Sequence, residues 1–338
     1  ECFQINPLIK DYNGPSCAYV AGPFGGYTAN ANGERFIECD YWSGQMMQEF
    51  YKELQSGNGP VFLRLNHLHK ETADHIEQIL HTVERPSRGR FHEGRGTHYY
   101  ETMIEMHISE IGFCSGHSAS GVFVDEFART TVPGLYAAGD MASVPHNYML
   151  GAFTNGATAG EDAIDFANEV DFEEFDRGEV ALEQERVLAP TRREDGIPPN
   201  QIEYKIRRLV NDYLQPPKVT RKYELAQARF AEVREDMETA MMARDSHELM
   251  RAMEVASIMD CADMAAFASL YRTESRWGLY HWRTDYPERD DENWNCHVLL
   301  SKQDGAMTCE KREVQPFIVP ISDDEKDAYY KQRITAEA

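Results

Sequence analysis

The ten residues Thr131–Asp140, TVPGLYAAGD, constrain what this chain can fold into more than any other stretch. Pro133-Gly134 predicts a turn, and the apolar run Leu135–Ala138 after it is typical of a buried parallel strand. The run ends on Gly139-Asp140, where a small residue lets the backbone approach a ligand and a carboxylate can hold a ribose or ribitol hydroxyl. A buried strand and turn without any ligand explains the pattern equally well.

A helix is expected to begin near Gly151, directly after this turn. Its small residues would allow a neighbouring group to come close; they are Gly156, Ala157, Ala159 and Gly160. The free N–H groups and the positive dipole end of such a helix favour an anionic group, such as a phosphate or the pyrimidine edge of a reduced flavin.

The composition excludes some classes of partner. A formal net charge of −23 argues against nucleic acid, because phosphate binding needs a basic surface. The seven cysteines are scattered without a CxxC, so the chain alone should form neither a disulfide framework nor a zinc or iron–sulfur site. That usage favours a reducing, cytoplasmic location. No stretch of about 18 apolar residues occurs that could cross a membrane. Because the chain begins at Glu1 rather than Met and enters directly on a strand-like run, we expect a preceding N-terminal part.

The first hundred residues predict a β-rich region with two helices. Asn32-Gly33 predicts a type I′ hairpin, residues 60–65 a strand, and residues 44–56 and 71–82 helices. The polar loop 85–98 has two interpretations, a mobile surface loop or an anion-contacting loop, because it holds a basic cluster of Arg85, Arg88, Arg90 and Arg95.

Residues 200–272 predict three helices, and residues 273–338 an irregular region with short strands. The first helix places one apolar face inward, formed by Ile206, Leu209, Val210, Tyr213 and Leu214. Pro216-Pro217 should end it. The second carries Phe230, Val233, Met237 and Met241 at helical spacing, and Asp245 with Glu248 can cap the third. The methionine stripe predicts core packing rather than a cofactor site.

Four stretches, in this order, resemble the fumarate reductase/succinate dehydrogenase flavoprotein superfamily. NANGERF (30–36) is similar to a capping-domain hairpin, and GNGPVFLRL (57–65) to the strand that follows it. TVPGLYAAGD resembles the second FAD fingerprint, and TESRWGLYHWRTDYPERDDENW (273–294) resembles a signature near the C-terminus. Within the superfamily, SGHSASGVFV (115–124), PHNYMLGAFTNG (145–156) and IKDYNGP (9–15) resemble the adenylylsulfate reductase α subunit.

Two departures put the substrate in doubt. Succinate and fumarate enzymes carry H-P-T-G and R-G-E-G motifs, where this chain has Asn6-Pro7-Leu8 and Gly22–Gly26. The adenylylsulfate enzyme carries an Arg at the position of Leu8. The substrate clamp of either enzyme is therefore not reproduced.

The resemblance implies an α/β + α fold made of four parts. They are an α+β capping domain (1–104), the C-terminal part of a GR2-type, Rossmann-like FAD-binding domain (105–170), a helical domain (171–272) and an irregular C-terminal region (273–338). The FAD-binding domain would be incomplete, since no G-x-G-x-x-G follows a strand into a helix. The missing N-terminal half of the same flavoprotein would supply that motif.

The resemblance also assigns site residues. FAD would contact Gly139, Asp140, Asn147, Tyr148, Leu150, Gly151 and Phe153. His117 is expected beside the flavin, His146 at the turn before the flavin-facing helix, and Arg276 on a substrate anion. Each has a structural alternative: core histidines for His117 and His146, and ion pairing with Asp290–Glu292 for Arg276 and Arg283.

The implied function is that of an FAD-dependent oxidoreductase. It would transfer two electrons between flavin and a small anionic substrate, coupled to a ferredoxin-like iron–sulfur β subunit, as in adenylylsulfate reductase. The alternatives are a fumarate reductase/succinate dehydrogenase-type flavoprotein and a non-catalytic flavin electron-transfer subunit.

Overall fold

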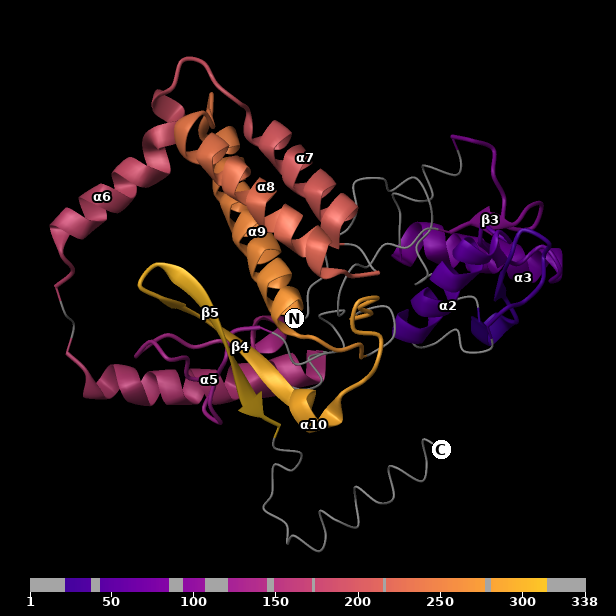
Figure 1. Ribbon diagram of the computed structural model, residues 1–338, viewed down its shortest axis with the longest axis horizontal. Helices are drawn as coiled ribbons and strands as arrows, with labels where there is room; N and C mark the ends of the chain where they lie inside the picture. The colour runs from indigo at the N-terminus through magenta and orange to yellow at the C-terminus, as the bar shows by residue number, and fades with distance from the viewer. Residues whose placement is uncertain are drawn as a thin grey trace, which may run out of the picture. The chain divides into compact units, whose positions relative to one another are not determined.

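A small antiparallel sheet, flanked by two helices, forms the first folded part of the computed structural model. Strands β1 (Tyr27–Ala29), β2 (Phe62–Arg64) and β3 (Ile104–Glu105) pair in that order. The two helices are α2 (Ser43–Ser56) and α3 (Lys70–Ile79) (Figure 1). Helix α3 continues into the π-helical turn η2 (Leu80–Glu84), and a 3-10 turn, η1 (Gly22–Phe24), precedes β1. The structure describes residues 22–37, 43–84, 94–106, 121–144, 149–171, 174–214, 217–276 and 281–314.

Side chains along β2 and its two flanking residues alternate between fully and partly buried, and the fully buried ones form the core of this part. Val61, Leu63 and Leu65 are fully buried, while the residues between them are less so. They pack with Phe50 of α2 and Ile76 of α3 in one apolar core. The predicted strand at 60–65 and the predicted helices at 44–56 and 71–82 are therefore confirmed.

The turn after β1 differs from the predicted type I′ hairpin. Gly33 has φ of 78°, but Asn32 does not lie at positive φ, which a type I′ turn requires at both central residues. The Asn30 side chain explains the difference, because its Oδ1 accepts hydrogen bonds from the Asn32 and Glu34 backbone N–H groups, both at 3.0 Å. This local side-chain bond fixes another turn geometry.

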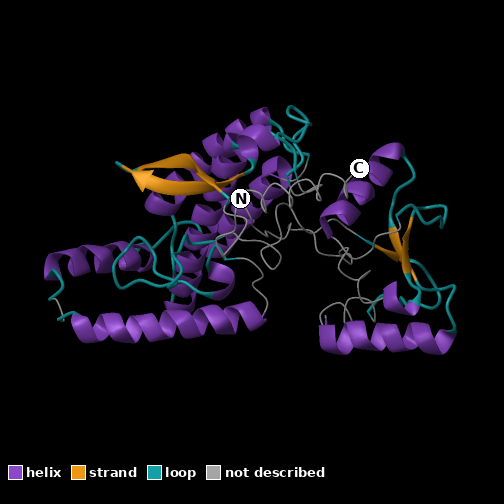
Figure 2. Cartoon of the chain, turned by 90° about the horizontal axis from the view of Figure 1, so that it is seen from below, coloured by secondary structure: helices purple, strands orange, loops and turns teal. Residues whose placement is uncertain are grey.

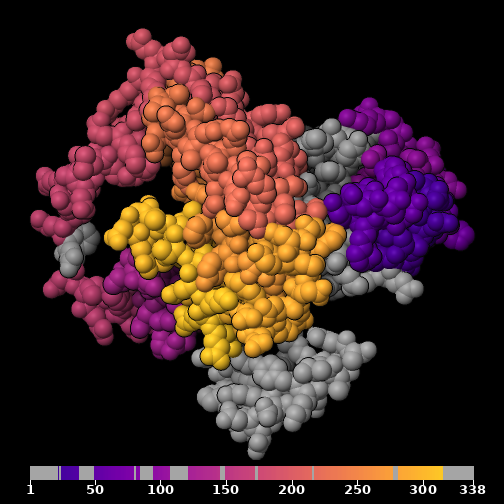
Figure 3. All heavy atoms as spheres, viewed as in Figure 1, coloured from indigo at the N-terminus to yellow at the C-terminus, as the bar shows by residue number. Residues whose placement is uncertain are grey.

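A helical bundle follows, built from α7 (Pro199–Leu209), α8 (Thr220–Thr239) and α9 (Ser246–Tyr271). The three helices pack on one another (Figures 1 and 3). The π-helical turn η6 (Val210–Leu214) extends α7 at its C-terminal end. Helix α6 (Arg177–Leu188) and the 3-10 turn η5 (Ala189–Arg192) precede α7 in the chain. The predicted apolar face is confirmed, because Ile206, Val210 and Leu214 are buried and Leu209 and Tyr213 pack against the same core.

The predicted cap of the third helix is also confirmed. Asp245 is the N-cap of α9, and its Oδ1 accepts a hydrogen bond of 2.8 Å from the Glu248 N–H. The Glu248 side chain accepts from the Arg244 N–H rather than from the N-cap N–H, which is a variation on the capping box. Phe230 and Val233 of α8 and the nearby Met241 are buried, and Met237 packs against them, so the methionine stripe belongs to the core.

The chain divides into two units, Glu1–Arg289 and Asp290–Ala338, and the second holds a long β-hairpin. The short helix α10 (Asp291–Trp294) leads into β4 (Cys296–Gln303) and β5 (Ala306–Glu313), paired over all eight residues (Figure 2). The expectation of an irregular region with short strands is wrong here. Asp304 and Gly305 lie at φ 49° and 83°, as a type I′ turn requires, so the Asp-Gly pair was a usable signal.

None of the described helices is long and apolar enough to cross a membrane. The mixed α and β content agrees with the expected fold class, and the three domain boundaries at 104, 170 and 272 stay predictions.

Candidate functional site

The fingerprint Thr131–Asp140 ends in a 3-10 turn, η4 (Gly139–Met141), that packs on helix α5 (Met149–Glu169). Gly139 has φ of 67°, which L side chains rarely adopt. A Cβ at Gly139 would lie 3.4 Å from the Ala152 Cβ. The two small residues therefore let the turn approach the N-terminal part of the helix closely, while the predicted approach of Gly139 to a ligand stays a prediction.

A second glycine fixes the segment beside this turn. The Val122 N–H donates to the Met141 carbonyl at 2.6 Å and the Ser143 N–H donates to the Val122 carbonyl at 2.9 Å, forming a parallel bridge. A Cβ at Gly121 would lie 2.2 Å from the Met141 carbonyl oxygen, so only glycine fits there. Val124, Ala137 and Ala142 form a small core behind the turn.

Two side chains fasten this segment to α5. Arg129 Nε donates to Asp162 Oδ2 at 2.6 Å, a second guanidinium N–H donates to Oδ1, and the Tyr136 hydroxyl donates to Oδ2 at 2.7 Å. The hydrogen bonds from Arg129 and Tyr136 lower the pKa of Asp162, although partial desolvation opposes them. The bond to Asp162, and secondarily desolvation, raises the pKa of Tyr136. The segment Arg129–Tyr136 is thus held to α5 at both of its ends.

The N-terminal turns of α5 present polar and apolar groups to solvent. Asp140 is exposed in η4, and Met149, Leu150 and Phe153 are exposed on α5, Leu150 to 80%. Exposed carboxylate oxygens can accept hydrogen bonds from ligand hydroxyls, and the uncovered apolar side chains can contact a flat ring. Gly151, in the same turns, is half-buried.

Two expectations about this region are wrong. Leu135–Ala138 is not a parallel strand in the described structure: Tyr136 makes a single antiparallel bridge to Arg129, and Leu135 is 53% exposed. The run instead bonds to the segment just before it: the Ala137 N–H donates to the Ala128 carbonyl at 3.1 Å, and the Thr130 N–H donates to the Leu135 carbonyl at 2.9 Å. Within the described part of the chain, Gly156, Ala157 and Gly160 do not face a close neighbour either, because they are exposed and a Cβ at either glycine would meet nothing within 4 Å. Only Ala159 is buried among the four small residues.

Four of the expected site residues lie outside the described residues. They are His117, His146, Asn147 and Tyr148. Most of the basic loop 85–98 lies outside them too. The structure therefore brings together Gly139, Asp140, Leu150, Gly151 and Phe153, and their role toward FAD remains a prediction.

Arg276 lies in a separate cluster after α9. Its Nε and one terminal N–H donate to the two Glu274 oxygens at 2.6 and 3.0 Å, and Arg272 donates to the same carboxylate at 2.7 Å. Glu274 is fully buried. A buried carboxylate between two guanidinium groups fixes the orientation of the Arg276 head group.

Arg283 and His281 complete this cluster. Arg283, fully buried, donates to both Asp285 oxygens at 2.8 Å, so its carboxylate partner is Asp285 and not the Asp290–Glu292 run. Burial opposes ionisation of Asp285, but the hydrogen bonds from Arg283 and Thr220 dominate and lower its pKa. Burial first, and then the charges of Lys218, Arg272 and Arg283, hold the pKa of His281 well below its usual value.

Sequence reasoning missed the partners that orient these groups. Asp162 lies 33 residues from Arg129, and Lys218 lies 63 residues from His281, so no local pattern links them. The pairing of Glu274 with Arg276 could have been predicted, because the E-S-R triplet puts a carboxylate two residues before Arg276.

Comparison with known proteins agrees with the geometry. Residues 17–154 match the family model described as "FAD binding domain", and residues 204–326 match "Fumarate reductase flavoprotein C-term". The first match confirms FAD as the cofactor of the family.

Two curated relatives are named as subunits of fumarate reductases. The fumarate reductase flavoprotein subunit of Mycobacterium tuberculosis is 27% identical over 357 residues, which cover 91% of this chain and 58% of the relative. A fumarate reductase (CoM/CoB) subunit of Methanothermobacter marburgensis is 23% identical over 301 residues, covering 82% of this chain and 51% of the relative. The chain thus spans little more than half the length of these relatives.

Solved structures show the same fold. Adenylylsulfate reductase of Archaeoglobus fulgidus aligns with a TM-score of 0.74 and 23% identity over 95% of this chain and 60% of that one. Quinol fumarate reductase FrdA of E. coli aligns with a TM-score of 0.73 and 20% identity over 95% and 59%. Since the two family models lie in the order that the sequence motifs predicted, the chain belongs to the fumarate reductase/succinate dehydrogenase flavoprotein superfamily.

Proposed function

We propose that Thr131–Asp140 and the first turns of α5 form one wall of an FAD site in an FAD-dependent oxidoreductase. The observation that carries the proposal is the close approach of Gly139 to Ala152, which sets the exposed Asp140 beside the N-terminal turns of α5. The "FAD binding domain" match over residues 17–154 supports it independently.

Each residue has a distinct role in this proposal. The Asp140 carboxylate would accept hydrogen bonds from ribityl or ribose hydroxyls, and Leu150, Gly151 and Phe153 would contact the ring system with Asn147 and Tyr148. FAD, when bound, supplies two-electron transfer to or from the substrate. His117 and His146 would hold or move a proton at an imidazole nitrogen as the ring charge changes.

Arg276 would bind a small anionic substrate. Its buried partner Glu274 supports this role, because a guanidinium held at two points by a carboxylate loses little conformational entropy when it binds a further anion. The electrons would pass to or from a ferredoxin-like iron–sulfur subunit. The names of the curated relatives support a partner, because each relative is named as one subunit of a larger enzyme.

Two substrates compete. Adenylylsulfate is favoured by the motifs at 115–124 and 145–156. Fumarate is favoured by the names of the curated relatives, although the R-G-E-G motif is absent at Gly22–Gly26. Reduced viologen oxidation by the full-length protein, measured with each substrate in turn, separates them.

The visible absorption spectrum of the purified full-length protein tests the claim that holds for either substrate, namely that the protein binds FAD. We expect the bands of bound flavin and their bleaching by dithionite. A full-length protein that carries no flavin, and gains none when incubated with FAD, would contradict it.

A further inference from the structure

Helix α5 has three sides of different character along its length (Figure 1). One side packs on the fingerprint segment through Ala152, Asp162 and Phe166, which contact Gly139, Arg129 and Gly134 in turn. A second side is polar and carries the exposed carboxylates of Glu161 and Asp165. The first side accounts for the packing of α5 on the fingerprint segment, and the second is suited to water.

The third side of α5 is apolar and exposed. Its members recur at three- and four-residue spacing, as one face of a helix requires, and we call them the α5 stripe: Leu150, Phe153, Ala157, Gly160 and Ile164. All five are exposed, Leu150 to 80%, Phe153 to 70% and Ile164 to 64%. At about 100° of rotation per residue, the stripe lies on the far side of the helix from Ala152 and Phe166. An apolar stripe of this length normally faces a core, so a second layer of protein is expected on it.

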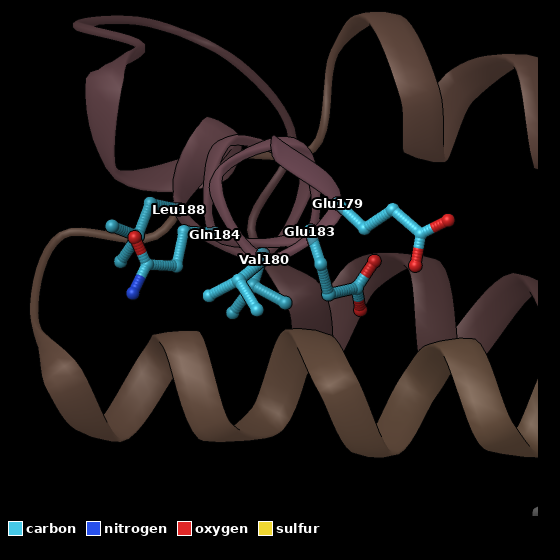
Figure 4. Close-up of a pocket in the computed structure, with 6 residues that line it drawn as sticks. Glu179, Val180, Glu183, Gln184 and Leu188 are labelled. Carbon is cyan, nitrogen blue, oxygen red and sulfur yellow. The ribbon is translucent and has the colours of Figure 1, made fainter. Parts of the chain in front are cut away.

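Helix α6 shows the contrasting pattern of a solvated helix. On one of its sides, Val180 and Leu188 lie among Glu183 and Gln184 (Figure 4). Glu183 is in turn paired with Arg186. A surface that mixes charged and apolar groups in this way favours water. The α5 stripe has no charged side chain between its members.

The curated relatives contain polypeptide that could cover the α5 stripe and that has no counterpart in this chain. The alignments cover only 58% of the Mycobacterium tuberculosis relative and 51% of the Methanothermobacter marburgensis relative. An FAD site also needs a glycine-rich turn for the pyrophosphate, and no G-x-G-x-x-G here follows a strand into a helix. Because the stripe begins at Leu150 and Phe153, beside the proposed flavin wall, the polypeptide that completes the FAD site lies next to it.

A second copy of this chain fits the α5 stripe less well. Each copy has a formal net charge of −23, and Glu161 and Asp165 lie along the polar side that borders the stripe. Two copies joined through their stripes would therefore bring like charges together.

We propose that the dinucleotide-binding half of the same flavoprotein packs on the α5 stripe. The inference rests on the proposed FAD function, because that function requires such a half. The stripe contributes apolar area to the contact, and Gly160, where a Cβ would meet nothing within 4 Å, leaves room for a close approach.

Thiol labelling of the full-length protein tests this packing. Ile164→Cys and Ala157→Cys each place a thiol on the α5 stripe, and Asp165→Cys places the matched thiol on the polar side of the same helix. Mass spectrometry of the peptides that contain these positions follows their reaction with a maleimide. We expect the thiols on the stripe to react at least about tenfold more slowly than the thiol at position 165, and all three to react alike in denaturant.

Dilution and flavin removal identify what covers the stripe. Protection that persists in dilute, monomeric protein supports packing within one chain, whereas protection that is lost on dilution would indicate a second copy and overturn the proposal. Positions 157 and 164 lie beyond the turns assigned to the flavin, so their protection should also persist in flavin-free protein. Protection in a protein that binds no flavin would support the packing while contradicting the FAD site. Equal labelling at positions 164 and 165 in flavin-loaded protein would overturn the packing and leave the FAD site standing.

Discussion

Asp162 accepts hydrogen bonds from both Arg129 and Tyr136, and so fastens the turn that carries the FAD fingerprint to the middle of α5. The fingerprint is thereby positioned from a distance, by a residue more than twenty positions after its end. The same helix α5 provides Ala152 opposite Gly139, so it supports the turn at two points.

Removing the Asp162 carboxylate should loosen this turn. Asp162→Asn leaves Arg129 without its ion-pair partner, and we expect a melting temperature lower by roughly 2–4 °C. The lowered pKa of Asp162 means that its contribution is present above about pH 4, the usual value, and is lost as the pH falls through the lower folded-state pKa. Thermal unfolding at pH 7 and pH 3 measures both effects. Asp165→Asn, on the exposed side of α5, should change neither.

Alanine substitutions at two glycines near the fingerprint should change the free energy of unfolding in opposite directions. Gly139→Ala places a Cβ on a backbone with φ of 67°, which costs about 1–2 kcal/mol. Gly156→Ala lies in the interior of α5 with nothing within 4 Å of the new Cβ, and should stabilise by about 0.5–1 kcal/mol. Denaturant unfolding of both variants checks the pair, and equal effects would show that Gly139 is not conformationally required.

His281 should make the stability of the protein decrease in acid. Its folded-state pKa lies well below its usual value of about 6.5, so below that pH the unfolded state binds a proton that the folded state does not. The free energy of unfolding should therefore fall by up to about 1.4 kcal/mol per pH unit below pH 6.5.

The variant His281→Gln isolates this effect. It cannot take up the proton next to Lys218, Arg272 and Arg283, so its stability should change less between pH 7 and pH 5. The exposed His247→Gln is the control and should retain the wild-type slope. An unchanged slope in His281→Gln would refute the assignment.

Trp282 connects the core of the small sheet to the segment before α8, because its carbonyl accepts a hydrogen bond of 2.8 Å from the Lys218 N–H. Its ring lies 5.4 Å from that of Tyr51 in an edge-to-face contact and packs against the core of the small sheet, while the flanking His281 and Arg283 are buried. Trp282→Ala should cost about 2–3 kcal/mol, because the ring is only partly buried, and should separate the unfolding of the sheet from that of the helical bundle. Calorimetry should then show two transitions. Tyr286→Ala, at an exposed ring nearby, should keep one.

Local patterns in the sequence predicted much of this fold. The apolar period of 3.6 identified α7–α9, and the carboxylate of Asp245 identified the start of α9. Alternation identified β2. These elements follow from interactions between residues a few positions apart, which a single sequence displays directly.

The remaining features depend on contacts between distant residues. The apolar run Leu135–Ala138 has the composition of a buried strand, but its pairing is decided by Arg129 and Asp162. The turn at Asn32-Gly33 has the composition of a type I′ turn, but the Asn30 side chain selects another geometry. The orientation of Arg276 depends on Glu274, whose burial no composition reveals.

The FAD content of the full-length protein with Asp140→Ala tests the central claim most directly. We expect wild-type protein to retain flavin, and the variant to lose at least about tenfold in FAD affinity, since it lacks the carboxylate that would bind the cofactor hydroxyls. Glu126→Ala, an exposed carboxylate in the neighbouring turn, should bind FAD like the wild type. An Asp140→Ala protein that holds FAD as tightly as the wild type would contradict the claim that this turn forms a wall of the flavin site.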